Sequence, residues 1–326
     1  MRRFAIAFIG SIVFAASAIA FIQPPDVEKK KAEAAERKKQ RDEVAKKQAE
    51  NAAKAKARLA TVADIHENVA YVEKPHERQK LDLYVPKSGS GPFPLLVWIH
   101  GGGWQGGSKD GCPWAFFVVR GYVVASINYR LSHHAVFPAQ IDDCQAALRW
   151  LRKNAATYKI DQNLIGIGGA SAGGHLSALL GVSGAGTKDK PDRCDVQCVV
   201  DIYGPANFLT IWPQSDPDKS VIKHNELNSP EGALFGGPIP EKTEIAKKAS
   251  PTLNVTKDAP PFLIFHGKKD YVVPWQQSEE LDAALRNAGV DSTLLLSETA
   301  GHDGKFFQPP YDKTLIEFFE KHLKKK

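Results

Sequence analysis

Cysteine is scarce in this sequence, and its distribution argues against a lipoprotein anchor and against a zinc site. The 326 residues hold four cysteines, Cys112, Cys144, Cys194 and Cys198. No cysteine follows the apolar N-terminal run, which argues against a lipoprotein anchor, and no further ligands near the four have zinc-site spacing. In an oxidising compartment the four could form two disulfides. We favour the pair Cys194–Cys198, because both lie in one polar loop before a strand.

An excess of charge is also missing from most of the chain. The formal net charge is +6, but residues 1–60 hold 14 Lys and Arg against seven Asp and Glu, and the rest hold 29 against 30. The main part of the protein is therefore near neutral, and its charge gives no argument for nucleic-acid binding. With 43% hydrophobic and 25% charged residues, the composition is that of a globular protein with a sizeable core. We find no internal repeat.

Residues 1–25 combine a basic start with a long apolar run. Arg2 and Arg3 precede an unbroken stretch of apolar or small residues from Phe4 to Ile22. Small residues around Ala18 offer cleavage sites, so the segment is predicted to be an export signal of a periplasmic or extracellular protein. An uncleaved membrane anchor is the alternative, since 19 residues are just enough to span a bilayer.

Residues 26–60 contain almost only Ala, Glu, Lys, Arg and Gln. Their helix propensity is high, but no apolar stripe is available to pack against another element. This composition predicts a solvated helical spacer or a disordered tether. Its basic excess leaves open a contact with anionic lipid or a cell-wall polymer, which would tether the protein to a membrane or cell surface.

From residue 61 onward, strand-like and helical patterns alternate. Strands are expected at 80–86, 94–100, 122–129, 163–169, 198–204, 261–267 and 293–299, and helices at 113–120, 138–158, 172–183, 274–288 and 311–324. This alternation predicts one α/β domain over 61–326 with a mostly parallel sheet and helices on both faces. The first strand alternates like an edge strand, and the last is expected to be more exposed. Residues 205–250 break the rhythm and are predicted to be a lid insertion.

The stretch "GASAGG" (169–174) lies between a predicted strand and a predicted helix. That context favours a nucleophile elbow, a tight turn that presents Ser171 in a strained conformation. The residues two positions away, Gly169 and Gly173, must be small to avoid a clash. A turn eased by glycine with an idle serine is the alternative.

The stretch "HGGGWQGG" (100–107) fits a dinucleotide-binding fingerprint through Gly101, Gly103 and Gly106. That motif requires an acidic residue about 20 positions further on, at the end of the next strand. The next strand ends in Asn-Tyr-Arg at 128–130, so the ribose-binding acid is missing. The pattern therefore argues against a nicotinamide enzyme.

The same stretch fits an oxyanion hole, whose backbone N–H groups stabilise the tetrahedral anion of ester hydrolysis. Only glycine lets the backbone come this close to a substrate. The predicted donors are Gly102, Gly103 and Ala172, with Trp104 as a further candidate. The indole of Trp104 is also a candidate substrate-binding group, stacking on a sugar or an aromatic acyl group. Packing in the core is the alternative role.

Two later strands end in the remaining groups that a serine nucleophile requires. Asp270 follows one in "HGKKDYVVP", and His302 follows the other in "SETAGHDG". The order Ser171, Asp270, His302, each after a strand, predicts a catalytic triad at one sheet edge. Asp201 in "VVDIYG" is the rival acid. No metal or cofactor is predicted.

These four motifs together resemble the α/β-hydrolase family over about residues 65–326. They are most similar to its hormone-sensitive-lipase-like and acetyl-xylan/feruloyl esterase-like branches. The usual lipase-like elbow has Asp before the serine, whereas this chain has Ala170. Residues 26–59 are also too polar to form the N-terminal cap of that branch. Both departures favour the carbohydrate-esterase-like branch.

The resemblance implies an α/β-hydrolase fold and a serine esterase that needs no cofactor. Its expected substrates are acetyl or feruloyl esters of polysaccharide. A general carboxylesterase or lipase on short acyl esters, and a related amidase or peptidase, are the alternatives among enzymes. A binding protein on an inactive hydrolase scaffold is the alternative from another class.

Overall fold

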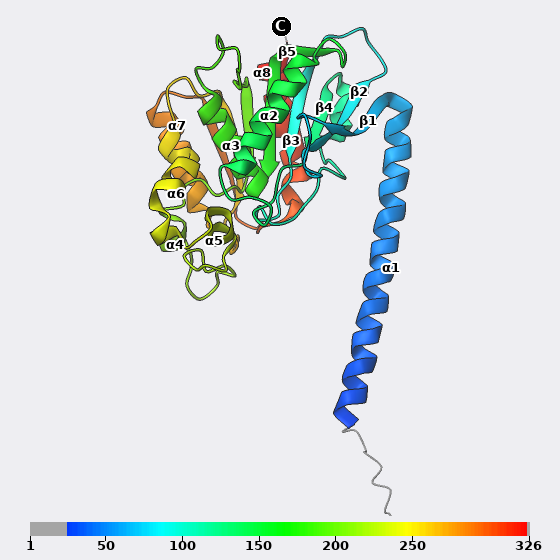
Figure 1. Cartoon of the computed structure of the whole chain (residues 1–326), viewed down its shortest axis with the longest axis vertical. Helices are drawn as coiled ribbons and strands as arrows, with labels where there is room; N and C mark the ends of the chain where they lie inside the picture. The colour runs from blue at the N-terminus through cyan, green and yellow to red at the C-terminus, as the bar shows by residue number, and fades with distance from the viewer. Residues whose placement is uncertain (1–24, 325–326) are drawn as a thin grey trace, which may run out of the picture. The chain divides into compact units, whose positions relative to one another are not determined.

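The computed structural model describes residues 25–324, and the chain divides into two units, Met1–Ala55 and Lys56–Lys326 (Figure 1). Helix α1 (Pro25–Val62) occupies the segment of high helix propensity, and side chains 29–39 are exposed, as expected without an apolar stripe. Among residues 25–324, none of the helices combines the length and the apolar character needed to cross a membrane. The apolar part of the predicted export signal lies outside the described residues.

An eight-stranded sheet organises the second unit, in the order β1-β2-β4-β3-β5-β6-β7-β8. The strands are β1 (Ala63–Ala70), β2 (Lys80–Pro86), β3 (Phe93–Ile99), β4 (Val123–Ile127), β5 (Ile160–Ala170), β6 (Cys198–Ile202), β7 (Phe262–Gly267) and β8 (Ser292–Ser297). Strands β1, β2 and β4 pair antiparallel, and the pairs from β4 through β8 are parallel. The mostly parallel sheet is therefore confirmed.

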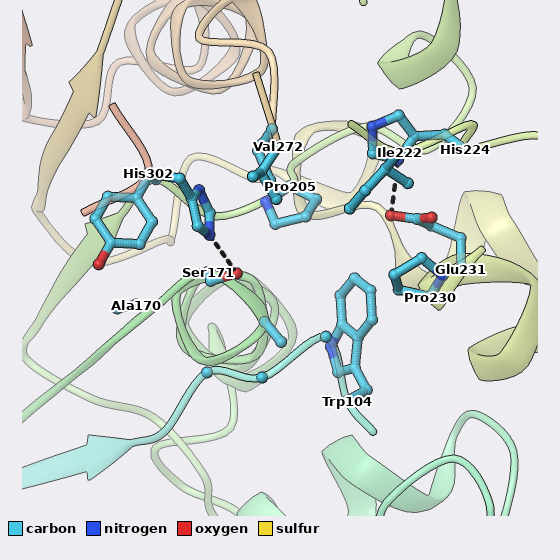
Figure 2. A pocket seen from close by; sticks show the side chains of 16 residues that line it. Trp104, Ala170, Ser171, Pro205, Ile222, His224, Pro230, Glu231, Val272 and His302 are labelled. Atoms are coloured by element: carbon cyan, nitrogen blue, oxygen red, sulfur yellow. Dashed lines mark hydrogen bonds and ion pairs between the residues drawn. The ribbon is translucent and has the colours of Figure 1, made fainter. Parts of the chain in front are cut away.

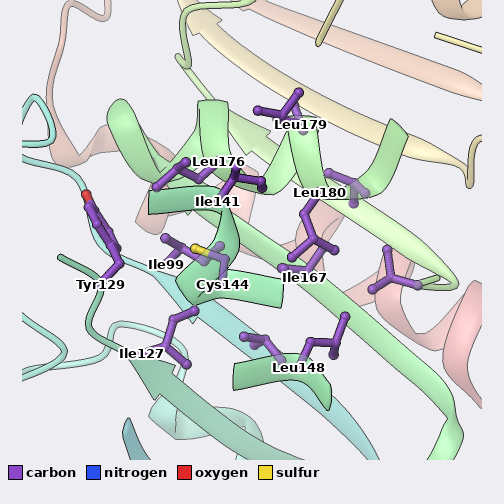
Figure 3. Packing of buried hydrophobic residues seen from close by; sticks show 14 of the residues in the cluster. Ile99, Ile127, Tyr129, Ile141, Cys144, Leu148, Ile167, Leu176, Leu179 and Leu180 are labelled. Carbon is purple, nitrogen blue, oxygen red and sulfur yellow. The ribbon is translucent and has the colours of Figure 1, made fainter. Parts of the chain in front are cut away.

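Helices cover both faces of this sheet. On one face lie α2 (Ala139–Lys153), α3 (Ala172–Gly184) and α7 (Gln276–Asn287), and on the other lie the 3₁₀ helix η1 (Ala115–Arg120) and α8 (Tyr311–Leu323). Figure 3 shows the first core, where Ile99, Ile127 and Ile167 of the strands pack against Leu148 and Leu176 of α2 and α3. Strands buried on both faces require continuous apolar runs, which is why the sequence marked them clearly.

Two predictions at the start of the domain are corrected. Strand β1 was not expected, because His66, Glu67 and Asn68 interrupt its apolar pattern, and its register shifts between His66 and Val69. Because β1 pairs with the outer side of β2, β2 is an interior strand and not the edge strand that its alternation indicated. The edge at the other end is β8, which is partly exposed as predicted.

The insertion at 205–250 is built from short helices joined by irregular backbone. They are α4 (Ile211–Gln214), α5 (Pro230–Phe235), the 3₁₀ helix η2 (Ile239–Glu241) and α6 (Thr243–Ala249). Helix α5 begins at Pro230, and the preceding Ser229 side chain accepts a hydrogen bond from the Gly232 N–H. Phe208 and Phe235 anchor the insertion in the core with ring centroids 5.0 Å apart. Two further 3₁₀ helices are η3 (Pro251–Asn254) and η4 (Gly304–Phe307).

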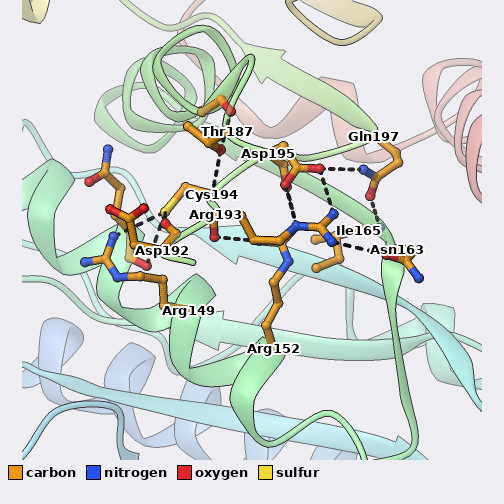
Figure 4. A network of polar contacts seen from close by, with 12 residues as sticks. Arg149, Arg152, Asn163, Ile165, Thr187, Asp192, Arg193, Cys194, Asp195 and Gln197 are labelled. Atoms are coloured by element: carbon orange, nitrogen blue, oxygen red, sulfur yellow. Dashed lines mark hydrogen bonds and ion pairs between the residues drawn. The ribbon is translucent and has the colours of Figure 1, made fainter. Parts of the chain in front are cut away.

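The favoured disulfide between Cys194 and Cys198 is wrong, since all four cysteines are free and buried. Cys194 belongs to the core on the α2 side of the sheet, whereas Cys198, the first residue of β6, belongs to the core on the opposite side. The loop before β6 is instead held by polar contacts (Figure 4). Arg149 donates to the Cys194 sulfur, and Arg193 donates to both carboxylate oxygens of Asp195.

Candidate active site

Ser171 lies in the tight turn between β5 and α3, with φ 57° and ψ −124°. Its N–H donates to the Ile202 carbonyl at 2.9 Å. A Cβ on Gly169 would lie 2.5 Å from the Gly173 backbone, and one on Gly173 would lie 2.1 Å from the Ile99 carbonyl oxygen. Glycine at both positions is therefore a steric requirement of this turn, as the sequence pattern indicated.

The structure brings the three predicted catalytic side chains into one hydrogen-bonded chain. His302 Nε2 lies 2.9 Å from Ser171 Oγ (Figure 2), and His302 Nδ1 lies 2.7 Å from Asp270 Oδ2. Asp270 is an acceptor, so His302 carries its proton on Nδ1 and presents a lone pair at Nε2 to the serine hydroxyl. This arrangement can withdraw a proton from Ser171 as its oxygen attacks a carbonyl carbon.

Asp270 is held by four donors. Its Oδ1 accepts from the N–H groups of Val272 and Val273 at 2.8 and 2.9 Å, and its Oδ2 accepts from His302 and, at 3.2 Å, from His266. Burial raises the pKa of Asp270, but the hydrogen bonds from His266 and His302 outweigh burial and hold its pKa below the usual range. The carboxylate therefore stays ionised beside His302.

His266 also contacts Asp270 and was not predicted from the sequence, although it is the first residue of the motif "HGKKD". It lies fully buried in β7, and its Nδ1 lies 2.7 Å from the hydroxyl of Ser278. The ring proton therefore sits on Nε2, which lies 3.1 Å from the Val273 carbonyl oxygen and 3.2 Å from Asp270 Oδ2, both of which are acceptors. A histidine four residues before an expected acid was the available signal.

The rival acid, Asp201, has different surroundings. It lies within β6, is fully buried, and its Oδ1 accepts from the Gly204 N–H at 2.9 Å. Within residues 25–324, its Oδ2 has no hydrogen-bond partner. Burial raises the pKa of Asp201 to about 7, so this carboxyl lacks the ionic stabilisation found at Asp270. The hydrogen bond to His302 comes from Asp270.

The predicted oxyanion donors lie on two elements beside Ser171. Gly102 and Gly103 have φ of +111° and +58°, and Ala172 is the first residue of α3. Among residues 25–324, no acceptor pairs with the backbone N–H of these three residues. All three line the same cavity as Ser171, at the positively polarised N-terminus of a helix. They form a set of N–H groups that can bind a developing oxyanion.

Trp104 packs under this loop. Its indole is 1% exposed, contacts His175 and Phe208 edge-to-face, and donates its N–H to His175 Nδ1 at 3.2 Å. His175 in turn lies 2.7 Å from the Ala249 carbonyl oxygen, and burial lowers its pKa to about 4. Trp104 lines the cavity, but its side chain is almost fully buried, so the structure favours the packing role over stacking on a substrate.

The cavity in front of Ser171 has a volume of about 390 Å³ and two unlike walls. One wall comes from the strand ends and includes Tyr203, Val272 and His302, with the Tyr203 ring 4.5 Å from the His302 ring. The other comes from the predicted lid insertion and includes Ile222 and Pro230 (Figure 2). The sequence indicated no wall residue in the insertion, because that segment has no periodic pattern.

A pair of buried polar side chains also belongs to the insertion wall. His224 Nδ1 lies 3.0 Å from Glu231 Oε1, and both side chains are almost fully buried. The pair joins the segment that carries Ile222 to helix α5, which begins at Pro230. It therefore holds together the two parts of the insertion that face Ser171.

A cluster of potential metal ligands lies away from this cavity. The structure places His76 and Glu77 beside His134, with the ligand atoms within 4.8 Å of one another. Nδ1 of His76 accepts from the Arg78 N–H, and Nδ1 of His134 accepts from the Leu131 N–H. Both neutral rings therefore carry their proton on Nε2 and offer no lone pair there, so we assign no metal to the cluster.

Proteins that this chain resembles in sequence and structure are named as esterases. A family model described as BD-FAE matches residues 81–285, more than half of the chain. The chain belongs to the BD-FAE family of α/β-hydrolase esterases. A truncated carbohydrate esterase from gut microbiota is similar in structure, with TM-score 0.74 and 33% identity, covering 81% of this chain and 98% of that one.

Two further relatives are more distant. An acetyl ester-xyloside bifunctional hydrolase from Caldicellulosiruptor lactoaceticus has TM-score 0.60 and 25% identity, covering 74% of this chain and 87% of that one. Esterase LipC from Mycobacterium tuberculosis is 34% identical over 203 residues, which are 60% of this chain and 49% of that protein. The chain spans about half the length of the curated relatives that it matches first.

Proposed function

We propose that this protein is a serine esterase that removes acetyl or feruloyl groups from polysaccharide. The observation that carries the proposal is the hydrogen-bonded chain Ser171–His302–Asp270. It ends at a cavity lined by backbone N–H groups that have no acceptor among residues 25–324. The family supports ester hydrolysis, and the gut carbohydrate esterase and the acetyl ester-xyloside hydrolase support a carbohydrate substrate.

In the proposed reaction, Ser171 Oγ attacks the ester carbonyl carbon while His302 Nε2 accepts the hydroxyl proton. The carbonyl oxygen becomes an oxyanion and accepts hydrogen bonds from the N–H groups of the glycine loop and of α3. His302 then protonates the departing alcohol, which leaves an acyl group on Ser171. Water, deprotonated by His302, hydrolyses that acyl-enzyme. Asp270 keeps His302 in the required tautomer and stabilises its charged form.

A panel of substrates tests the acyl and alcohol parts of this proposal. Acetylated xylan, methyl ferulate and p-nitrophenyl esters of increasing acyl length are compared by kcat/KM, with Ser171→Ala as the blank. Release of acetate from xylan at a kcat/KM above that of simple acetate esters is the expected result. A preference for longer acyl esters would favour a general carboxylesterase. No turnover of any ester would favour a binding protein.

We also propose that residues 1–25 direct export and that residues 26–60 act as a spacer. The apolar run after two arginines supports export, and the basic excess of the first 60 residues supports a contact with anionic surfaces. Cell fractionation combined with mass spectrometry of the mature N-terminus tests export. Retention of the uncleaved N-terminus in the membrane fraction would favour the anchor. Release from anionic vesicles as salt rises would support a surface contact.

A further inference from the structure

The loop between β1 and β2 contains none of the motifs found in the sequence. One of its side chains, Arg78, nevertheless contacts the glycine-rich stretch 100–107. Arg78 is half-buried, and its Nη2 lies 3.0 Å from His100 Nε2 and donates to the Gly107 carbonyl at 2.9 Å. Its Nε lies 3.4 Å from the Tyr129 carbonyl oxygen. Arg78 therefore contacts both ends of the stretch 100–107 and is not among the residues that line the cavity.

The contact with Arg78 determines which nitrogen of His100 carries the proton. A guanidinium can only donate, so His100 Nε2 must accept and the ring proton must sit on Nδ1. His100 Nδ1 lies 2.7 Å from the Gly101 carbonyl oxygen, to which it donates. Burial, together with the charge of Arg78, lowers the pKa of His100 to about 4, so the ring stays neutral near neutral pH. The ring also stacks on Tyr129 at 4.4 Å.

The Gly101 carbonyl belongs to the same peptide unit as the Gly102 N–H, one of the three proposed oxyanion donors. In a planar trans peptide the C=O and N–H point in opposite directions, so fixing the carbonyl fixes the direction of the N–H. The next carbonyl, of Gly102, accepts from the N–H groups of Gln105 and Gly106 at 3.0 Å. A Cβ on Gly107 would lie 2.3 Å from the Gly101 carbonyl oxygen, so the loop closes tightly over this hydrogen bond.

We propose that Arg78 is a positioning residue of the oxyanion hole. Arg78 holds His100 in the Nδ1–H tautomer, His100 holds the Gly101 carbonyl, and the Gly102 N–H is thereby aimed at the ester oxygen. The inference rests on the proposed function, because the Gly102 N–H matters for turnover only if an oxyanion forms in front of it. Arg78 itself is not among the residues that line the cavity, so its role would be to position the loop.

The first test compares Arg78→Met with the matched control Arg193→Met. Arg193 is also half-buried and also donates several hydrogen bonds, but on the loop before β6. Complete loss of one oxyanion donor costs about 10²–10³-fold in kcat. Misalignment should cost less, so Arg78→Met is expected to lower kcat on p-nitrophenyl acetate by about 10–100-fold with KM nearly unchanged. Arg193→Met should leave kcat unchanged.

A transition-state analogue and a double-mutant cycle distinguish a positioning role of Arg78 from a purely structural one. Affinity for a boronic acid that forms a tetrahedral adduct on Ser171 should fall by the same factor as kcat/KM in Arg78→Met. His100→Phe keeps a ring for stacking on Tyr129 but removes the donor to Gly101, so the double variant with Arg78→Met should be no worse than His100→Phe alone. Additive losses, or an unchanged kcat in Arg78→Met, would overturn the relay.

A spectroscopic measurement keeps the inference separate from the proposed function. Nitrogen-15 NMR of the His100 ring in the wild type should show the Nδ1–H tautomer, and Arg78→Met should shift the ring toward a mixture of tautomers. If the wild type hydrolyses no ester but Arg78→Met still changes the tautomer, the proposed function is wrong and the hydrogen-bond relay stands. An Nε2–H tautomer in the wild type would overturn the relay itself.

Discussion

The two walls of the cavity differ in how they are built. The wall that carries His302 and the neighbouring Ser171 comes from the turns and loops that follow adjacent parallel strands, so the sheet brings these side chains to one edge. The facing wall comes from short helices and irregular backbone of the insertion, held by Phe208, Phe235 and a buried His–Glu pair. The first wall supplies the reactive groups, whereas the second supplies mainly apolar surface and shape. Chemistry and substrate choice should therefore respond to different mutations.

The largest effect is expected at the nucleophile. Ser171→Ala should lower kcat on a short p-nitrophenyl ester by about 10⁶-fold, because the covalent step is lost. The melting temperature should remain within a few degrees, since the serine hydroxyl contributes only its hydrogen bond to His302. Turnover near that of the wild type in a pure preparation would show that Ser171 is not the nucleophile.

The next largest effect is expected at the acid. Asp270→Asn should lower kcat by about 10⁴-fold, because the amide can no longer hold His302 in the required tautomer or stabilise its charged form. Asp201→Asn serves as the comparison. This variant should retain most of the activity, because Asp201 does not hydrogen-bond to His302. If Asp201→Asn is inactive and Asp270→Asn is not, then Asp201 is the acid of the triad.

The two carboxyl groups also predict opposite effects of pH on stability. The pKa of Asp201 is about 7 in the folded protein but near 3.9 when unfolded, so the folded state binds more protons between these values. Stability from Asp201 is therefore present below about pH 4 and lost as pH rises toward 7. Asp270, whose folded pKa is lowered, contributes stability above about pH 4 that is lost on further acidification.

Urea unfolding at pH 5 and pH 7.5 measures the effect of Asp201. Between these conditions the wild type should lose on the order of 2 kcal/mol more unfolding free energy than Asp201→Asn, which cannot titrate. Parallel changes in the two proteins would mean that Asp201 is already ionised at pH 5.

These contrasts also explain what the sequence could predict. The parallel strands and the three reactive side chains were predictable, because buried strands need continuous apolar runs and their ends share one edge. Strand β1 was missed because its polar residues hide the pattern, and the position of β2 was misjudged as a consequence. The disulfide prediction failed because proximity in sequence does not show that Cys194 and Cys198 lie on opposite faces of the sheet.

The insertion wall should control acyl size with a smaller effect. Ile222→Ala enlarges the cavity, so the ratio of kcat/KM for butyryl over acetyl p-nitrophenyl esters should rise about ten-fold, the lower end of the range for a methylene in a pocket. Val221→Ala is the matched control, because Val221 is 70% exposed and does not line the cavity. Equal ratios in the two variants would show that Ile222 does not help to bind the acyl group.

The smallest effect is expected from removing the N-terminal unit. A variant that begins at Lys56 keeps the ion pair between Lys56 and Glu67, the packing of Leu59 on the core, and the hydrogen bond from the Lys87 N–H to the Val62 carbonyl. Its melting temperature should lie within a few degrees of the full chain. Its kcat on a small soluble ester should be unchanged, because every proposed catalytic group lies beyond residue 99.

A variant that begins at Tyr71 provides the contrast, because it also removes β1. Strand β2 then becomes an uncovered edge with unpaired backbone groups, so this protein should be much less stable and prone to aggregate. Circular dichroism melts of the two variants measure the difference. If the variant that begins at Lys56 is also insoluble, or loses activity on the small ester, then residues 1–55 stabilise the fold or shape the cavity. If both shortened proteins match the full chain in stability, then β1 is dispensable and β2 tolerates an open edge.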